Sequence, residues 1–141
     1  MPDALGTDDA GGLAESAPPR VGPVVWWFGL GATSFVAACS TWIVYREGLP
    51  ERFAAIPELD KALHLGMAGA LAFFLDGVLR RRALRVGRSS VPLAAVLLLV
   101  PAGIEEFFQR YSVHRSSSLG DFAADVAGVA IFIWLSRRIG R

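Results

Sequence analysis

The sequence contains only one cysteine, one lysine and one glutamine among its 141 residues, and it contains no asparagine. The lone Cys39 cannot form an internal disulfide, and no His/Cys spacing typical of a zinc site is present. Cys39 stands in an apolar run, where it is expected to pack as a small hydrophobe. We therefore predict neither a disulfide framework nor a bound metal or other cofactor.

The residues before Cys39 also allow a second interpretation. Residues 36–39, Val-Ala-Ala-Cys, loosely resemble a bacterial lipoprotein cleavage site that follows an apolar run. However, the apolar run continues after Cys39 as far as Tyr45, and the segment before it is acidic, whereas a secretory signal has a basic start and a short apolar core. These features favour a membrane span over lipidation.

Charge is also scarce in this chain. Charged residues make up 19% of the sequence and hydrophobic residues 53%, and the mean hydropathy is +0.44. A soluble domain of this composition would have too little polar surface to cover its core, so a lipid bilayer is the expected partner. The net charge is only +1, and the arginines form short clusters at the ends of apolar runs. This pattern argues against a nucleic-acid partner.

Four apolar runs predict an all-α fold, a bundle of four transmembrane helices over residues 24–45, 61–79, 91–108 and 119–136. Residues 1–23 are rich in glycine, proline and acidic residues, and they are predicted to form a disordered cytoplasmic tail before a membrane domain over residues 24–141. Tryptophans near both ends of the first run are typical of membrane interfaces. Pro92 is expected in the first turn of the third helix, and Pro101 is expected to kink it.

The distribution of basic residues predicts the orientation of these helices. The nine on one side are Arg20, Arg80, Arg81, Arg82, Arg85, Arg88, Arg137, Arg138 and Arg141, and the five on the other are Arg46, Arg52, Lys61, Arg110 and Arg115. By the positive-inside rule, both termini of this multi-pass protein are predicted to be cytoplasmic. The strong preference for arginine over lysine is typical of a GC-rich bacterial genome, so the expected location is a bacterial plasma membrane.

Ionisable side chains interrupt the apolar runs at a common depth. At about 1.5 Å per residue from the inner end of each predicted helix, His64 lies ~24 Å and Glu106 ~22 Å along its helix. Asp121 and Asp125 lie ~24 Å and ~18 Å along theirs. Charged groups are costly in a bilayer and usually face a partner or a wet cavity. We therefore predict a shared polar layer near the outer surface.

Within each predicted helix these polar residues are three or four positions apart, which places them on one face. The candidate catalytic residues are His64, Glu106 and Asp121. The full polar cluster that would bind a ligand consists of Asp60, Lys61, His64, Glu106, Gln109, Arg115, Asp121 and Asp125. Two interpretations stay open: an outward-opening pocket, or a buried hydrogen-bond network in which Lys61 or Arg115 neutralises the acids and holds the helices together.

Another acidic residue, Asp76, lies near the inner boundary. It precedes Arg80 by four residues, so a pair at the membrane surface with a snorkelling arginine is expected. Because Asp76 is the only acid toward the inner side of the predicted helices, proton or ion transport is the least favoured function.

The outer polar residues resemble the motifs of the VanZ-like family of small bacterial integral membrane proteins. The resemblance rests, in chain order, on Asp60-Lys61-x-x-His64, Glu106-x-x-Gln109, Arg115, and Asp121 with Asp125 and Gly128. It covers residues 60–128, about half of the chain. Two features depart from the family pattern: Asp125 stands where many members carry asparagine, and residues 110–114 lack the expected Pro-Gly type of turn. The family is named for a member associated with resistance to the glycopeptide teicoplanin.

Two functions follow as expectations. In the first, the outward pocket binds an envelope component, such as a cell-wall precursor or a lipid headgroup, and modulates susceptibility to teicoplanin-type glycopeptides. In the second, the protein is a membrane-embedded enzyme in which Glu106 or His64 is the general base acting on an envelope lipid or sugar. Asp121 and Asp125 would then orient the base or hold a divalent cation. The resemblance itself implies no established catalytic activity.

Overall fold

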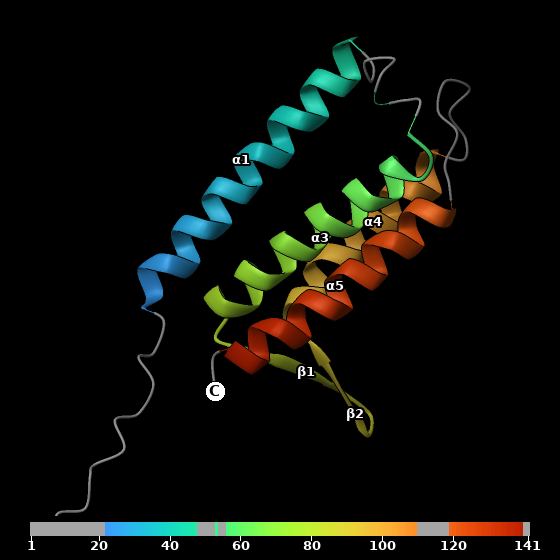
Figure 1. Ribbon diagram of the computed structural model, residues 1–141. Helices are drawn as coiled ribbons and strands as arrows, with labels where there is room; N and C mark the ends of the chain where they lie inside the picture. Colours follow the sequence, from blue (N-terminus) through green and yellow to red (C-terminus); the bar gives the residue numbers. More distant parts are fainter. Residues whose placement is uncertain (1–21, 48–52, 54–55, 110–118, 140–141) are drawn as a thin grey trace, which may run out of the picture.

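A computed structural model describes residues 22–47, 53, 56–109 and 119–139 of the chain. Of five residues inside the helices only the backbone is described, namely Tyr45, Glu105, Glu106, Phe108 and Gln109. The predicted tail over residues 1–23 lies almost entirely outside the described residues. The described chain forms four long helices and one short β-hairpin (Figure 1).

The helices agree closely with the predicted apolar runs. They are α1 (Pro23–Glu47), α3 (Leu59–Val78), α4 (Leu93–Gln109) and α5 (Leu119–Ile139). Among the described residues, α1, α3 and α5 are long and apolar enough to cross a membrane. The apolar part of α4 is shorter and covers only Leu93–Ile104, because a strand occupies the residues before it and two glutamates follow it. The composition therefore supports a membrane protein with three clear candidate spans rather than four.

A two-stranded antiparallel hairpin connects α3 to α4, so the all-α prediction was wrong for this segment. Strand β1 (Ala83–Val86) pairs with β2 (Ser89–Pro92), with Val86 opposite Ser89 and Ala83 opposite Pro92. The turn has Gly87 at its first central position with a φ of 61°, a conformation that glycine adopts without steric cost. Because Pro92 ends β2, it precedes α4 instead of standing in its first turn.

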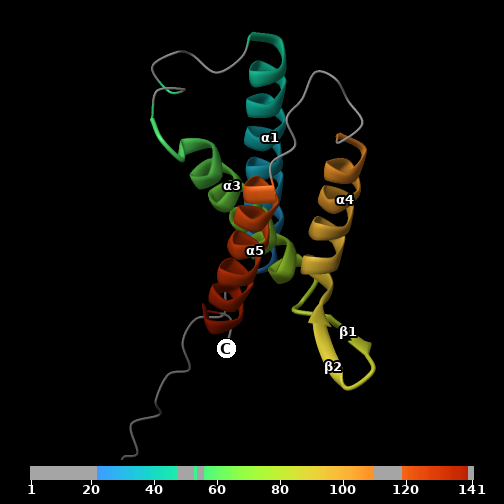
Figure 2. The same cartoon turned by 90° about the vertical axis from the view of Figure 1, so that its right-hand side faces the viewer.

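The four helices alternate in direction, so the molecule has two distinct ends (Figures 1 and 2). The hairpin end holds the start of α1, the end of α3, the hairpin, the start of α4 and the end of α5. The opposite end, called here the loop end, holds the end of α1 and the starts of α3 and α5. This alternation agrees with the up-and-down order expected for consecutive membrane spans.

The most extensive helix contact in the described chain is between α3 and α5. It depends on small residues: a Cβ atom at Gly128 would overlap the backbone carbonyl of Leu65, and one at Gly69 would overlap the ring of Phe132. Small residues allow helix backbones to approach closely, which is the usual way that helices associate in lipid. A cluster of buried apolar side chains continues this contact toward the hairpin end and includes Ala72, Ala94, Val129 and Ile133.

Helix α1 is attached to the rest of the molecule mainly through α3. Trp26, near the start of α1, is only 6% exposed and lies against the rings of Phe73 and Phe74 and against Gly77. Farther along, α1 and α3 are separated by an open apolar groove of about 430 Å³ lined by residues such as Ala32, Val36 and Gly66. Most large side chains of α1 are exposed.

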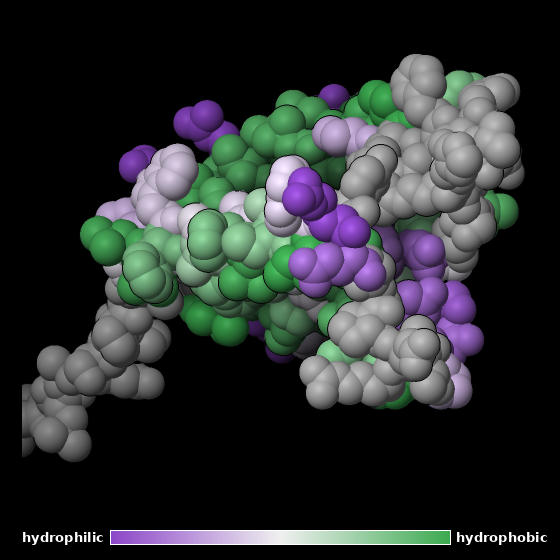
Figure 3. All heavy atoms as spheres, turned by 90° about the horizontal axis from the view of Figure 1, so that it is seen from above, coloured by the Kyte–Doolittle hydropathy of each residue, from purple (hydrophilic) through white to green (hydrophobic). Residues whose placement is uncertain are grey.

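Large apolar side chains are exposed on every helix, as expected for a surface that lipid would cover. Figure 3, which views the molecule from the loop end, shows broad hydrophobic areas with hydrophilic residues in separate groups. The described chain is therefore organised as a helix bundle with an apolar exterior suited to a membrane, with its ionisable groups collected toward the two ends.

Replacing Gly128 with alanine should separate α3 from α5. The new methyl group would overlap the Leu65 carbonyl, and overpacking of this kind costs about 1–3 kcal/mol. The free energy of unfolding in detergent, measured by denaturant titration, should fall accordingly. Gly31→Ala and Gly66→Ala are matched controls, because nothing lies within 4 Å of an added Cβ at either position. In those variants alanine should stabilise the helix by ~0.5–1 kcal/mol. Equal effects at all three glycines would contradict the close contact.

Candidate functional site

At the loop end, two residues of the predicted polar cluster meet across the α3–α5 contact. The Nδ1 atom of His64 lies 3.1 Å from Oδ1 of Asp125. His64 directly precedes Leu65, the residue whose carbonyl abuts Gly128, and Asp125 lies one turn before Gly128. The glycine contact therefore fixes the register that brings the imidazole to the carboxylate. The His64 side chain is 47% exposed and that of Asp125 is 18% exposed, so the pair lies at an open edge of the bundle.

Asp121 lies one turn before Asp125 on α5 and faces the same cluster. Its Oδ1 atom is buried and has no hydrogen-bond partner among the described residues. Asp60, Asp121 and Asp125 all act electrostatically on the His64 ring, so three acidic side chains lie around it. A buried carboxylate oxygen without a donor is costly, and this atom is therefore a natural acceptor for a further donor group.

Lys61 and Asp60 extend the cluster at the start of α3. Lys61 forms an ion pair with Glu58, a residue that the sequence analysis did not include. Glu58 has a left-handed backbone with a φ of 61° at the beginning of the helix, which places its carboxylate beside Lys61 three positions later. Asp60 is exposed. Lys61, one of the two cations expected to neutralise the acids of the cluster, is thus already paired with a local acid, although Asp121 still acts on it electrostatically.

The remaining predicted site residues lie outside the described part of the chain. The side chains of Glu106 and Gln109 are not described, although both residues belong to the last turns of α4, and Arg115 lies in the undescribed segment 110–118. Of the predicted cluster, the structure therefore brings together His64, Asp121 and Asp125, with Asp60 and Lys61 at its edge.

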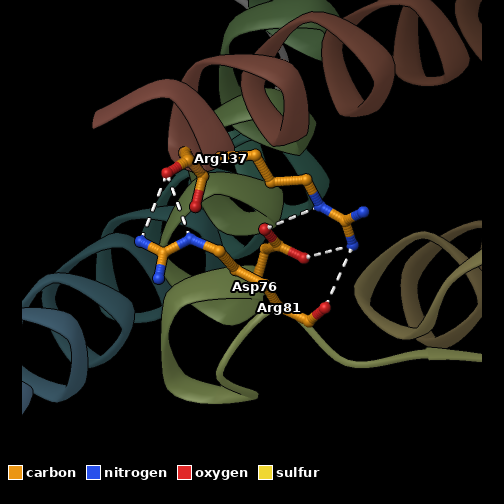
Figure 4. A network of polar contacts seen from close by, with 4 residues as sticks. Asp76, Arg81 and Arg137 are labelled. Atoms are coloured by element: carbon orange, nitrogen blue, oxygen red, sulfur yellow. Dashed lines mark hydrogen bonds and ion pairs between the residues drawn. The ribbon is translucent and has the colours of Figure 1, made fainter. Parts of the chain in front are cut away.

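A second polar network lies at the hairpin end, and its partners differ from the prediction. Asp76 is 0% exposed, and its carboxylate accepts two hydrogen bonds from Arg137, at 3.2 Å from Nη2 and 3.3 Å from Nε (Figure 4). The pair expected between Asp76 and Arg80 does not form. Arg80 instead has a left-handed backbone with a φ of 52°, which turns the chain away at the end of α3.

Arg81 completes this network, which we call the hairpin-end clasp and define as Asp76, Arg81, Ser136 and Arg137. The Arg81 guanidinium donates to the Ser136 carbonyl at 3.3 and 3.4 Å, and Arg137 donates to the Arg81 carbonyl at 3.4 Å (Figure 4). The Arg81 amide donates to the Asp76 carbonyl and the Arg80 amide to the Gly77 carbonyl, the pattern of a Schellman helix end. The Arg81 guanidinium also lies 5.5 Å from the centre of the Trp26 ring, so the clasp joins α1, α3 and α5.

The two polar groups are therefore different in kind. In the hairpin-end clasp every charged side chain is hydrogen-bonded within the protein, as in a structural network, and the buried atom without a partner there is the neutral hydroxyl of Ser136. The loop-end cluster is partly exposed and rich in acidic side chains, and it contains a buried carboxylate oxygen with no donor among the described residues. Among the described residues, no group of three or more histidine, cysteine, aspartate or glutamate side chains is placed to hold a metal ion. The loop-end cluster is the candidate functional site.

Comparison with known proteins adds no relative: no family model matches the chain, and neither a curated protein nor a solved structure matches it.

Removing the Asp76 carboxylate should destabilise the bundle far more than removing its predicted partner. Asp76→Ala leaves the Arg137 guanidinium without its carboxylate, which should cost about 3 kcal/mol, the lower end of the range for a broken buried pair because Arg137 is 32% exposed. Arg80→Ala should change the free energy of unfolding by less than about 0.5 kcal/mol. Denaturant titration of both variants in detergent measures the difference. A larger loss for Arg80→Ala than for Asp76→Ala would contradict the assignment of the clasp.

Proposed function

We propose that this chain is a VanZ-like membrane protein of the bacterial cell envelope whose loop-end cluster forms an outward-facing polar pocket for an envelope component. The observation that carries the proposal is the contact of His64 with Asp125, together with the nearby Oδ1 atom of Asp121, which is buried and has no partner among the described residues. These residues belong to the motifs that resemble the VanZ-like family. His64 lies on α3, whereas Asp121 and Asp125 lie one turn apart on α5, at an edge that is partly exposed.

The outward orientation of the pocket is supported by the distribution of arginine. In the described chain, the hairpin end carries Arg80, Arg81, Arg82, Arg85, Arg88, Arg137 and Arg138, whereas the loop end carries Arg46 and Lys61. By the positive-inside rule the hairpin end is cytoplasmic, and the loop end with its pocket faces outward. Both chain termini are then on the cytoplasmic side of the plasma membrane.

The chemistry of the pocket favours a ligand rich in hydrogen-bond donors. The Asp121 Oδ1 atom needs a donor, and the second nitrogen of His64 has no partner among the residues described. Hydroxyl groups can donate to the carboxylate and also pair with the imidazole, so the sugar or headgroup of an envelope lipid fits both requirements. By binding such a component, the protein would change the access of teicoplanin-type glycopeptides to it at the cell surface.

One observation also favours an enzyme as the alternative. Asp125 contacts Nδ1 of His64, and a carboxylate in this position holds the imidazole in the tautomer whose Nε2 atom accepts a proton. His64 would then be the general base for a reaction of an envelope lipid or sugar, with Asp125 as its orienting group. This reaction would use the same pocket. The two functions therefore differ only in whether the bound ligand is released unchanged or chemically altered.

Binding of a lipid-linked cell-wall precursor to the protein in nanodiscs tests the proposal. Asp121→Asn should weaken binding about 10–100-fold, because a hydrogen bond to a charged acceptor is worth ~1.5–3 kcal/mol. His64→Gln should weaken binding similarly. Glu47→Gln is the matched control, because it removes an exposed acid at the loop-end terminus of α1, outside the cluster, and should have little effect.

Two readouts accompany this experiment. Melting temperature separates a binding pocket from a structural network, because a purely structural role would lower stability and binding together. Mass spectrometry of the recovered precursor separates binding from catalysis, since an enzyme would return a changed molecule. Equal precursor binding by the wild type, Asp121→Asn and His64→Gln would refute the proposed pocket.

A further inference from the structure

The β-hairpin has one apolar face and one basic face. Residues opposite each other in an antiparallel pair point to the same side, so Leu84 with Val91 and Val86 with Ser89 share one face. Arg85 pairs with Ser90 on the other face, and Arg88 stands in the turn. Leu84 is 43% exposed and Val86 is 63% exposed, so the apolar face is uncovered by the described chain.

The arginines of the hairpin have no counter-charge in the described part of the protein. Residues 77–104 contain no aspartate or glutamate, and Asp76 is already bonded to Arg137. Arg82, Arg85 and Arg88 are all exposed and form no ion pair or hydrogen bond through their side chains within the described residues. This surface, defined as Arg82, Leu84, Arg85, Val86 and Arg88, is called the hairpin patch.

Backbone hydrogen bonds fix the position of the hairpin patch relative to the end of α3 and the start of α4. The Leu93 amide donates to the Arg82 carbonyl at 2.9 Å, which closes the base of the hairpin at the start of α4. The Arg82 amide donates to the Leu79 carbonyl at 3.2 Å, which joins the other side of the base to the end of α3. Both helices end or begin at this level, so the patch projects from the bundle where its apolar helices stop (Figures 1 and 2).

We propose that the hairpin patch lies in the headgroup layer of the membrane and binds anionic phospholipid headgroups through Arg82, Arg85 and Arg88, while Leu84 and Val86 enter the apolar region beneath. Guanidinium groups bind phosphate through paired hydrogen bonds, and basic groups beside a membrane span attract anionic lipid. The proposal depends on the candidate spans alone and is independent of the loop-end pocket.

The exposed side chains of Leu84 and Val86 favour a phospholipid over a water-soluble anion as the ligand of the hairpin patch. A soluble phosphate or an acidic peptide would meet the arginines but leave Leu84 and Val86 in water. At a membrane interface, headgroup phosphates and the adjoining acyl chains meet both faces of an amphipathic element. The acidic residues Asp3, Asp8, Asp9 and Glu15 of the chain itself are the competing occupant, and the test below includes them.

Titration of the full chain in neutral detergent with a short-chain phosphatidylglycerol, followed by native mass spectrometry, tests the proposal. The wild type should bind phosphatidylglycerol more tightly than phosphatidylcholine of the same chain length. The triple variant Arg82→Gln, Arg85→Gln, Arg88→Gln should lose at least tenfold in phosphatidylglycerol affinity at low salt, because each arginine contributes roughly fivefold. Added salt should weaken binding by the wild type and have little effect on the triple variant.

Three controls distinguish a phospholipid from the other possible ligands of the hairpin patch, which are a soluble phosphate and the acidic residues of the chain itself. Arg46→Gln removes an exposed arginine at the loop end and should leave phosphatidylglycerol affinity unchanged. Free glycerol phosphate at the same concentration should not displace the lipid. Neutralising Asp3, Asp8, Asp9 and Glu15 with asparagine or glutamine should also leave the affinity unchanged. The proposal is overturned if the wild type does not prefer phosphatidylglycerol, if the triple variant binds it equally, if glycerol phosphate competes, or if binding appears only after the acidic residues are neutralised.

Discussion

The close contact of α3 with α5 is the constraint on which the rest of the structure depends. The absence of a side chain at Gly128 lets the Leu65 carbonyl approach the α5 backbone. Once this register is set, His64 must meet Asp125 at the loop end, and Asp76 must meet Arg137 at the hairpin end. Lipid offers no hydrophobic driving force between helices, so close packing and polar contacts of this kind are what hold such a bundle together.

The same two helices therefore produce two polar regions with opposite properties. The hairpin-end clasp buries the Asp76 carboxylate and pairs it with a guanidinium, and it also anchors α1 through Trp26. In the loop-end cluster, a carboxylate oxygen of Asp121 has no hydrogen-bond partner among the described residues and lies near a half-exposed imidazole. A bundle that is held by a buried ion pair at one end can keep a partly exposed acidic cluster at the other, because local stability need not be uniform across a structure.

Much of this arrangement could be predicted from the sequence. The helical spacing of Asp121 and Asp125 and the depth of His64 predicted a shared layer, and the structure places His64 beside Asp125, whereas the depth count had put it level with Asp121. The hairpin was missed because five arginines in ten residues suggested a solvated loop, although Gly87-Arg88 between two short alternating segments is a hairpin signal. The predicted pair of Asp76 with Arg80 was wrong because the prediction assumed that the helix continues to Arg80. Arg80 and Arg81 instead both adopt left-handed backbone conformations. Such turns depend on tertiary contacts that local spacing does not encode.

The most direct test of this account is the distance between His64 and Asp125 in a lipid bilayer. Solid-state NMR on protein with ¹⁵N-labelled histidine and ¹³C-labelled aspartate, in a His114→Gln background that leaves one histidine, measures it without altering either residue. The structure places Nδ1 3.1 Å from Oδ1, so strong dipolar transfer between the ring nitrogen and a side-chain carboxyl carbon is predicted. A His64 ring without any nearby aspartate carboxyl would contradict the α3–α5 register and, with it, the pocket.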